Sequence, residues 1–177
     1  RRKTIGMGLA YLKQAERGIH SSIIDKEEFI MSQSKTIITV ATTGAWPKKE
    51  NNPNVPMTPA EIAEDIYDCW KAGAAIAHLH MRDGKGDGTM DKEKFRQTVE
   101  LLRSSHPDCD IVLNMTTSGA LGASDEERMA HVQELRPEMA SYDCGSMNWL
   151  HSGVFLNPPK FLEQLGGAQH QLPGALV

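Results

Sequence analysis

The sequence has few cysteines, no long apolar run and no excess of positive charge, and each shortage argues against a class of protein. Its three cysteines, Cys69, Cys109 and Cys144, form no CxxC pair, which argues against a disulfide framework and a thiolate zinc knuckle. We therefore expect a reducing, cytoplasmic setting. No apolar run approaches the roughly 20 residues that span a bilayer. The formal net charge of −4 gives no electrostatic basis for binding nucleic acid or an anionic membrane.

Three motifs common in α/β enzymes are also missing. The chain contains no GxGxxG loop, no GxSxG elbow and no Walker loop, which argues against a dinucleotide-binding fold, an α/β-hydrolase and a P-loop nucleotide enzyme. What remains is an ordinary composition, with 40% hydrophobic and 24% charged residues in 177. This length is sufficient for one domain with a substantial core.

The chain does contain a repeated alternation of strand and helix patterns. Strands are predicted to begin near Lys35, Ala75, Asp110 and Met139. Helix starts follow them at Thr58-Pro59, Asp91, Ser124 and Asn157-Pro158. This alternation predicts an α/β protein in which helices cross between parallel strands. An open doubly wound sheet and a (β/α)8 barrel both fit, although a barrel needs eight β-α units and this chain has about four.

The second predicted strand carries two histidines. His78 and His80 are two residues apart in an extended segment, so their side chains point to the same face. They are about 7 Å apart along the strand, at a rise of ~3.3 Å per residue, so two neutral imidazoles could share one metal ion. The alternative is that one histidine is a hydrogen-bonded core residue and the other is incidental. Arg82 and Asp83, followed by the glycine-rich segment 84–88, favour a site.

Every predicted strand ends in polar residues. These are Thr42 and Thr43, His80 and Arg82, Thr116 to Ser118, and Ser146 with Asn148. Polar groups that converge at the carboxyl ends of parallel strands are what a barrel active site requires. The segment 45–57, with three prolines and no periodicity, is typical of a binding loop or lid.

Both ends of the chain look different from the middle. Residues 1–30 carry no clear strand or amphipathic pattern, and we expect them to be a leader or extension. We assign residues 31–165 to the domain formed by the strand–helix alternation, and residues 166–177 to an atypical tail.

These motifs together resemble those of the β-keto acid cleavage enzymes, a family of zinc-dependent (β/α)8 barrels that includes 3-keto-5-aminohexanoate cleavage enzymes. The matching stretches, spread in order over residues 35–165, are ATTGA at 41–45, NPNVP at 52–56, HLHMRD at 78–83, TTSG at 116–119, LRPEMAS at 135–141 and GSMN at 145–148. The resemblance implies a partial (β/α)8 barrel of about four units, covering the N-terminal half of the family's fold.

The same resemblance implies a reaction and roles for residues. A small β-keto acid and acetyl-CoA would give acetoacetate and a new CoA thioester. His78 and His80 match two zinc ligands. The substrate-binding positions match Thr116, Thr117, Gly119, Ser146 and Asn148. The family's third ligand, a glutamate, and its catalytic residues lie on the eighth strand, so we expect the chain alone to be inactive, with no catalytic residue of its own.

Four units with open strand edges are also expected to self-associate into a homo-oligomer. A second hypothesis is therefore a non-catalytic metal- or ligand-binding half-barrel that pairs with itself or a partner. Trp46 stands where some family members carry glutamate, which argues against selectivity for an amine-bearing substrate. Arg82 is expected to form a structural ion pair near the rim. Asp143 is expected to cap a strand end, with a contact to a histidine as the alternative.

Overall fold

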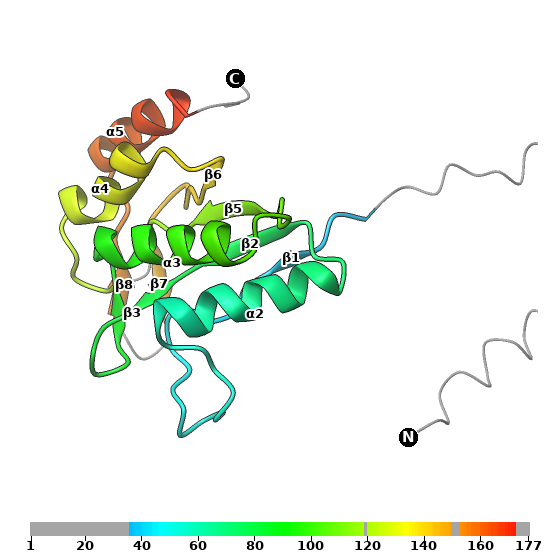
Figure 1. Ribbon diagram of the computed structural model, residues 1–177. Helices are drawn as coiled ribbons and strands as arrows, with labels where there is room; N and C mark the ends of the chain where they lie inside the picture. The colour runs from blue at the N-terminus through cyan, green and yellow to red at the C-terminus, as the bar shows by residue number, and fades with distance from the viewer. Residues whose placement is uncertain (1–35, 119, 150–152, 173–177) are drawn as a thin grey trace, which may run out of the picture. The chain divides into compact units, whose positions relative to one another are not determined.

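A parallel sheet of four strands forms the centre of the fold in the computed structural model, which describes residues 36–118, 120–149 and 153–172. The strands are β1 (Thr39–Val40), β2 (Ile76–Leu79), β5 (Val112–Met115) and β6 (Met139–Ala140), in the order β1-β2-β5-β6 (Figure 1). All three neighbouring pairs are parallel. The edge strands β1 and β6 pair over only two residues each, so they are shorter than their apolar sequences predict.

Four helices alternate with these strands, and three of them have side-chain N-caps. They are α2 (Pro59–Lys71), α3 (Lys92–Ser105), α4 (Asp125–Leu135) and α5 (Pro159–His170). Thr58 with Glu61 and Ser124 with Glu127 form complete capping boxes, and Asp91 caps α3. These caps satisfy backbone N–H groups that the first turn of a helix leaves without partners. The expected α/β order is thereby confirmed.

Two antiparallel hairpins were not predicted. One pairs β3 (Met81–Arg82) with β4 (Gly88–Thr89), directly after the second histidine. The other pairs β7 (Met147–Trp149) with β8 (Gly153–Phe155), where no strand was predicted. Each strand is only two or three residues long, which is too short to give a periodic sequence signal.

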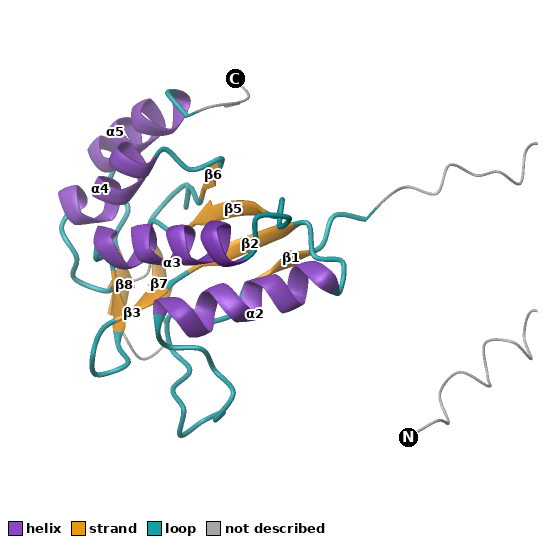
Figure 2. Cartoon of the chain, viewed as in Figure 1, coloured by secondary structure: helices purple, strands orange, loops and turns teal. Residues whose placement is uncertain are grey.

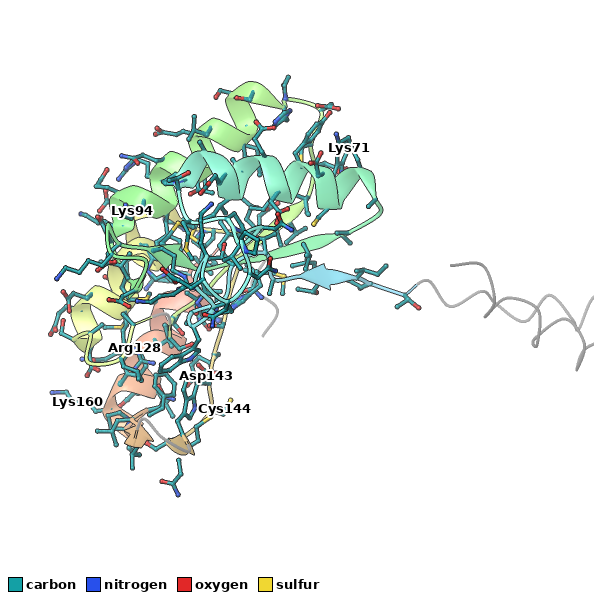
Figure 3. The ribbon with its side chains drawn as sticks, turned by 90° about the horizontal axis from the view of Figure 1, so that it is seen from below. Lys71, Lys94, Arg128, Asp143, Cys144 and Lys160 are labelled. Carbon is teal, nitrogen blue, oxygen red and sulfur yellow. The ribbon has the colours of Figure 1, made fainter. Side chains whose placement is uncertain are left out.

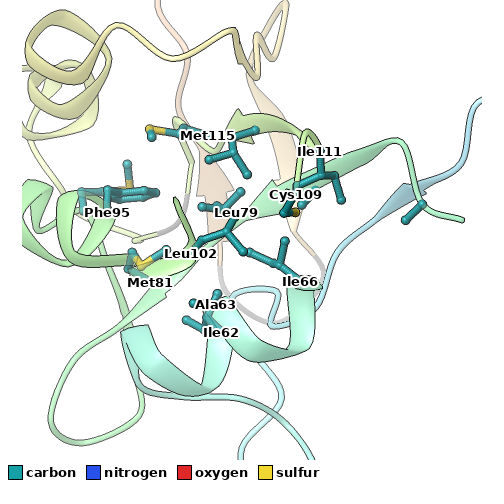
Figure 4. Close-up of a cluster of buried hydrophobic side chains, with 14 residues drawn as sticks. Ile62, Ala63, Ile66, Leu79, Met81, Phe95, Leu102, Cys109, Ile111 and Met115 are labelled. Atoms are coloured by element: carbon teal, nitrogen blue, oxygen red, sulfur yellow. The ribbon is translucent and has the colours of Figure 1, made fainter. Parts of the chain in front are cut away.

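The core lies between the sheet and the helices α2 and α3, which cover one of its faces (Figure 2). Ile62 and Ile66 of α2 and Phe95 and Leu102 of α3 are fully buried there. They pack with Leu79, Met81, Leu113 and Met115 from the strands (Figure 4). A second cluster joins Met129 of α4 to Phe161 and Leu165 of α5.

The opposite face of the sheet is less covered. Ile76, His78, Val112 and Asn114 alternate with the core residues of β2 and β5 and are only half-buried. Ile37 and Ile38, next to β1, are exposed. The strand alternation therefore places the fully buried side chains of β2 and β5 against the helices, and His78 and Asn114, together with Ile76 and Val112, on the more open face.

The structure describes part of the expected C-terminal tail but not the expected N-terminal leader. α5 extends through Gly166 and Gly167 to His170, so the first part of the expected tail is helical. Residues 1–30, expected to be a leader, and residues 173–177 lie outside the described residues. Among the helices that are described, none is both long and apolar enough to span a bilayer.

The contribution of the α2 contact to stability can be tested at Ile66, which is 0% exposed. We expect Ile66→Ala to lower the free energy of unfolding by about 2–5 kcal/mol, because it leaves a cavity against the sheet. Ile38→Ala is the matched control, since that side chain is 53% exposed, and it should change stability by less than about 0.5 kcal/mol. Urea denaturation followed by circular dichroism measures both, and equal effects would contradict this account of the core.

Candidate functional site

The two histidines of β2 lie together at the carboxyl edge of the sheet. His78 lies within β2 and His80 follows its last residue, so both side chains point away from α2 and α3. Their Nε2 atoms are 3.1 Å apart, with ring planes at 76°. Two imidazoles bound to one tetrahedral zinc at 2.0–2.1 Å place their nitrogens about 3.3 Å apart. The observed pair is therefore close to the spacing that a shared metal ion requires.

Burial keeps both imidazoles neutral. It lowers the pKa of His80 to about 4, and the neighbouring His78 and Arg82 add to this effect. Burial also lowers the pKa of His78, although Asn114 and Asp143 oppose that shift. Neutral imidazole is the form that binds a metal. Within the described ranges no third His, Cys, Asp or Glu joins the pair, so these residues offer two ligands.

Thr116 lies beside this pair, at the end of the neighbouring strand. Its backbone N–H donates to the carbonyl of Leu79 at 3.1 Å, which aligns Thr116 with His80. Its side chain is buried, and its Oγ1 is 3.3 Å from the hydroxyl of Ser118. His131 of α4 donates from Nε2 to the Thr116 carbonyl at 2.8 Å and fixes this strand end from outside the sheet.

The other predicted substrate-binding residues differ in their placement. The Thr117 hydroxyl donates to the Ser141 carbonyl at 3.0 Å and joins the ends of β5 and β6. The Ser146 hydroxyl accepts from the backbone of Asn157, and Asn148 lies exposed in β7. Among the residues described, no hydrogen bond links Ser146 or Asn148 to the histidines. Gly119 lies outside the described residues.

Asn114 is a neighbour of the site that the sequence argument missed. It pairs with His78 across β2 and β5 and lies on the same half-buried face. A signal was available, because Asn114 and Thr116 are two residues apart in a strand, as the two histidines are. The same alternation that places His78 and His80 on one face places the side chains of Asn114, in β5, and Thr116, directly after it, on the histidine side.

Two buried arginines hold the loops around this edge. Arg82 is 1% exposed and donates to the carbonyls of Thr43, Gly44 and Gly86 at 2.8–3.1 Å. Within the described part of the chain it forms no ion pair, so the expected ion-pair partner is replaced by carbonyl oxygens. The fork of five N–H donors on a guanidinium suits such multiple contacts.

Arg128 of α4 holds the segments after β5 and β8 in the same way. It donates to the carbonyls of Thr117 and Leu156 and to Oδ1 of Asn157 at 2.6–3.1 Å. Its guanidinium stacks over Phe161 at 4.0 Å. Figure 3, which shows the molecule from below, labels Arg128 and Asp143. In the described structure, the Asp143 carboxylate makes no hydrogen bond to a histidine; its charge raises the pKa of His78.

An aromatic cavity opens next to the site. It has a volume of 350 Å³ and is lined by the two tryptophans Trp46 and Trp149, with Ser118 and Leu121. The two indole rings are 5.6 Å apart, at 42° to each other. The loop after β1 supplies Trp46 and the β7 strand supplies Trp149. The cavity is therefore built from segments that lie far apart in the sequence.

Comparison with known proteins shows which family the chain is similar to. A family model described as beta-keto acid cleavage enzyme matches residues 35–172. A 3-keto-5-aminohexanoate cleavage enzyme from Fusobacterium nucleatum is 43% identical over 132 residues, which is 75% of this chain and 47% of that protein. A 3-dehydrocarnitine:acetyl-CoA trimethylamine transferase from Rhizobium meliloti is 34% identical, over 74% of this chain and 50% of that protein.

A solved structure supports the same relationship. The apo structure of ObcA superposes with a TM-score of 0.58 and 26% sequence identity, covering 66% of this chain and 28% of that one. The chain spans about half the length of the curated relatives that it matches.

The burial of His131, which contacts the strand end at Thr116, can be tested through the pH dependence of stability. Burial lowers its folded-state pKa from 6.5 to about 4, so the unfolded chain takes up the proton first as the pH falls. Stability present above pH 6.5 should be lost as the pH falls towards 4. When the pH falls from 7 to 5, we expect proton uptake by His131 in the unfolded chain to lower the free energy of unfolding by about 2 kcal/mol.

His131→Gln should remove this loss, since it removes the titrating group. His170→Gln, at an exposed position at the end of α5, should keep it. Urea unfolding at the two pH values measures the difference. An unchanged pH dependence in His131→Gln would show that other groups account for it.

Proposed function

The chain belongs to the beta-keto acid cleavage enzyme family, and from this membership we propose that it supplies part of the active site of a zinc enzyme. The reaction we assign converts a β-keto acid and acetyl-CoA into acetoacetate and a new CoA thioester. The fold is a partial (β/α)8 barrel of about four β-α units. Its ligands are a small β-keto acid and acetyl-CoA.

The observation that carries this proposal is the pair of neutral imidazoles at the strand ends, with Nε2 atoms 3.1 Å apart. His78 and His80 would hold Zn²⁺ through these two atoms. Zinc bound there would act as a Lewis acid that polarises the ketone. Nδ1 of His80 is buried without a hydrogen-bond partner among the described residues, so it is free to donate to an acceptor that would orient this ring on the metal.

The remaining residues of the edge have binding and positioning roles in this proposal. Thr116 offers a hydroxyl and Asn114 a side-chain amide on the histidine face, and both can bind substrate oxygens. Thr117 keeps the ends of β5 and β6 together through Ser141. Ser146, Asn148 and Gly119 stay assigned to substrate binding by the family resemblance.

The aromatic cavity is the place we assign to the side chain of the β-keto acid. Trp46 and Trp149 present large apolar surfaces there. A neutral or apolar side chain would bury area against them. The lining also includes Asp87, but this carboxylate pairs with Lys48 at 2.7 Å, so it is already neutralised by a cation. With Trp46 where some family members carry glutamate, this supports a substrate different from an amino-bearing β-keto acid.

Zinc binding is the most direct test of the site. We expect His78→Ala and His80→Ala each to weaken zinc binding by about tenfold or more, because each removes one of two imidazole ligands. His170→Ala, which removes an exposed histidine of α5, should leave zinc affinity unchanged. Competition with a chelating dye measures all three affinities. Equal affinities in the wild type and the two site variants would exclude this pair as the zinc site.

The 177-residue chain by itself is expected to give little or no acetoacetate, because two imidazoles bind zinc more weakly than a site with a third, carboxylate ligand. A coupled assay for acetoacetate from a β-keto acid and acetyl-CoA checks this, with an intact relative as the positive control. A rate comparable to that of the relative would refute the expectation.

The exposed apolar residues Ile37, Ile38 and Val154 favour the second hypothesis, a half-barrel that associates with itself or a partner. Size-exclusion chromatography with zinc titration separates the two functions. A dimer that binds stoichiometric zinc tightly without turnover supports the non-catalytic half-barrel, and a monomer with weak zinc binding supports the enzyme fragment.

A further inference from the structure

His131 of α4 is a fully buried imidazole that the proposed reaction does not use. Its side chain is 0% exposed, and its ring stacks on Phe95 of α3 with centroids 4.3 Å apart and planes at 15°. Its Nε2 lies 2.8 Å from the carbonyl oxygen of Thr116, which can only accept, so Nε2 carries the proton. Nδ1 is then the unprotonated nitrogen, and it is buried without a hydrogen-bond partner among the described residues.

An imidazole at this position costs more than an apolar side chain would. The buried Nδ1 loses its hydration without gaining a partner, and packing does not recover that cost. A leucine or methionine would also contact Phe95 and would leave no nitrogen unpaired. The one thing that an apolar residue lacks is a donor for the Thr116 carbonyl, so this hydrogen bond is the physical reason for a histidine here.

The Thr116 carbonyl requires this donor because the neighbouring strand turns away. In a parallel ladder, the N–H and the carbonyl of one residue bond to two residues of the next strand that are two positions apart. The Thr116 N–H donates to Leu79 at 3.1 Å, so a continued ladder would join the Thr116 carbonyl to Met81. Met81 instead begins β3 and pairs with Thr89 of β4. His131 takes the place that Met81 would have had.

His80 is the residue that lies at this end of the ladder. It follows the last residue of β2, and the Leu79 carbonyl belongs to the peptide bond that joins Leu79 to His80. Two hydrogen bonds, of 2.8 and 3.1 Å, therefore connect His131 through the Thr116 backbone to that peptide bond. His78, by contrast, lies within β2 and is in register with a residue of β5.

α4 is a firm support for this connection. One turn before His131, Arg128 donates to the carbonyl of Thr117 at 2.7 Å and to Oδ1 of Asn157 at 2.6 Å. Arg128 and His131 are three positions apart, so they lie on one face of the helix and hold two consecutive carbonyls of the same segment. A metal site keeps its geometry when the groups behind its ligands are themselves held in place.

We propose that His131 is a positioning residue of the zinc site, which holds His80 at the distance from His78 that one zinc ion requires. This rests on the proposed function, in which these two histidines bind zinc. His131 acts through the backbone of Thr116 and does not touch the metal. Its effect is to keep the two Nε2 atoms, 3.1 Å apart, near the spacing of two ligands on one ion before the ion arrives.

The test compares substitutions of His131 in the 177-residue chain. His131→Leu removes the donor and keeps an apolar side chain against Phe95, whereas His131→Gln keeps an N–H donor in its amide. We expect His131→Leu to weaken zinc binding by about fivefold, less than the loss of a ligand would, and His131→Gln to stay within about twofold of the wild type. Competition with a chelating dye at pH 7 measures these affinities. His131→Met, whose flexible side chain adapts to the space, repeats the comparison with a second apolar residue.

Val132→Ala is the matched control, because Val132 is the next residue of α4, is also 0% exposed and has no polar group in its side chain. It should lower the free energy of unfolding, measured in urea, and leave zinc affinity unchanged. Circular dichroism checks that each variant is folded. The proposal is overturned if the two apolar variants of His131 bind zinc as tightly as the wild type, or if Val132→Ala weakens binding as much as they do. It is also overturned if His131→Gln is as weak as His131→Leu, since the loss would then not depend on the donor.

The variants of the two site histidines separate this inference from the proposed function. If His78→Ala and His80→Ala weaken zinc binding and His131→Leu does not, only the positioning role of His131 is wrong. If His78→Ala and His80→Ala leave zinc affinity unchanged, the proposed function is wrong, and the role of His131 is wrong with it.

Discussion

The arrangement of the site depends on two guanidinium groups held among backbone carbonyls. A buried arginine keeps its charge, so its N–H groups must find acceptors or the fold incurs a large desolvation cost. Arg82 meets this need with carbonyls after β1 and in the β3–β4 turn. Arg128 meets it with acceptors after β5 and β8. Each therefore joins loops that are distant in sequence, and together they fix the surroundings of the histidines.

The sequence predicted the features that depend on local chemistry. Capping residues identified the starts of α2 and α4, and period-two spacing placed His78 and His80 on one face. Features that depend on distant partners were not predictable in this way. The hydrogen-bond acceptors of Arg82 lie up to 39 residues away in the sequence. The residues next to Arg82 in the sequence do not indicate whether these acceptors are backbone carbonyls or a carboxylate. The hairpins β3–β4 and β7–β8 are too short to show a pattern.

The site is also divided in a way that neither strand nor helix patterns reveal. The hairpin that follows the second histidine lines two cavities. Asp87 and Gly88 line the aromatic one, and the turn from Asp83 to Gly86 lines a second one, with Lys49 and Lys94. The first offers apolar surface, and the second offers charged side chains. The hairpin thus separates two kinds of binding chemistry within a few residues of the same strand end.

The position of β2 inside the sheet limits how this protein can change in evolution. β2 pairs with β1 on one side and with β5 on the other, and Leu79 lies between the two histidines, facing the core. Deleting or inserting one residue in the strand would turn both imidazoles towards α2 and α3 and bring Leu79 to the open face. Length changes should therefore accumulate in the 45–57 segment and the helix connections, while the 76–80 segment keeps a constant length among relatives that retain the site.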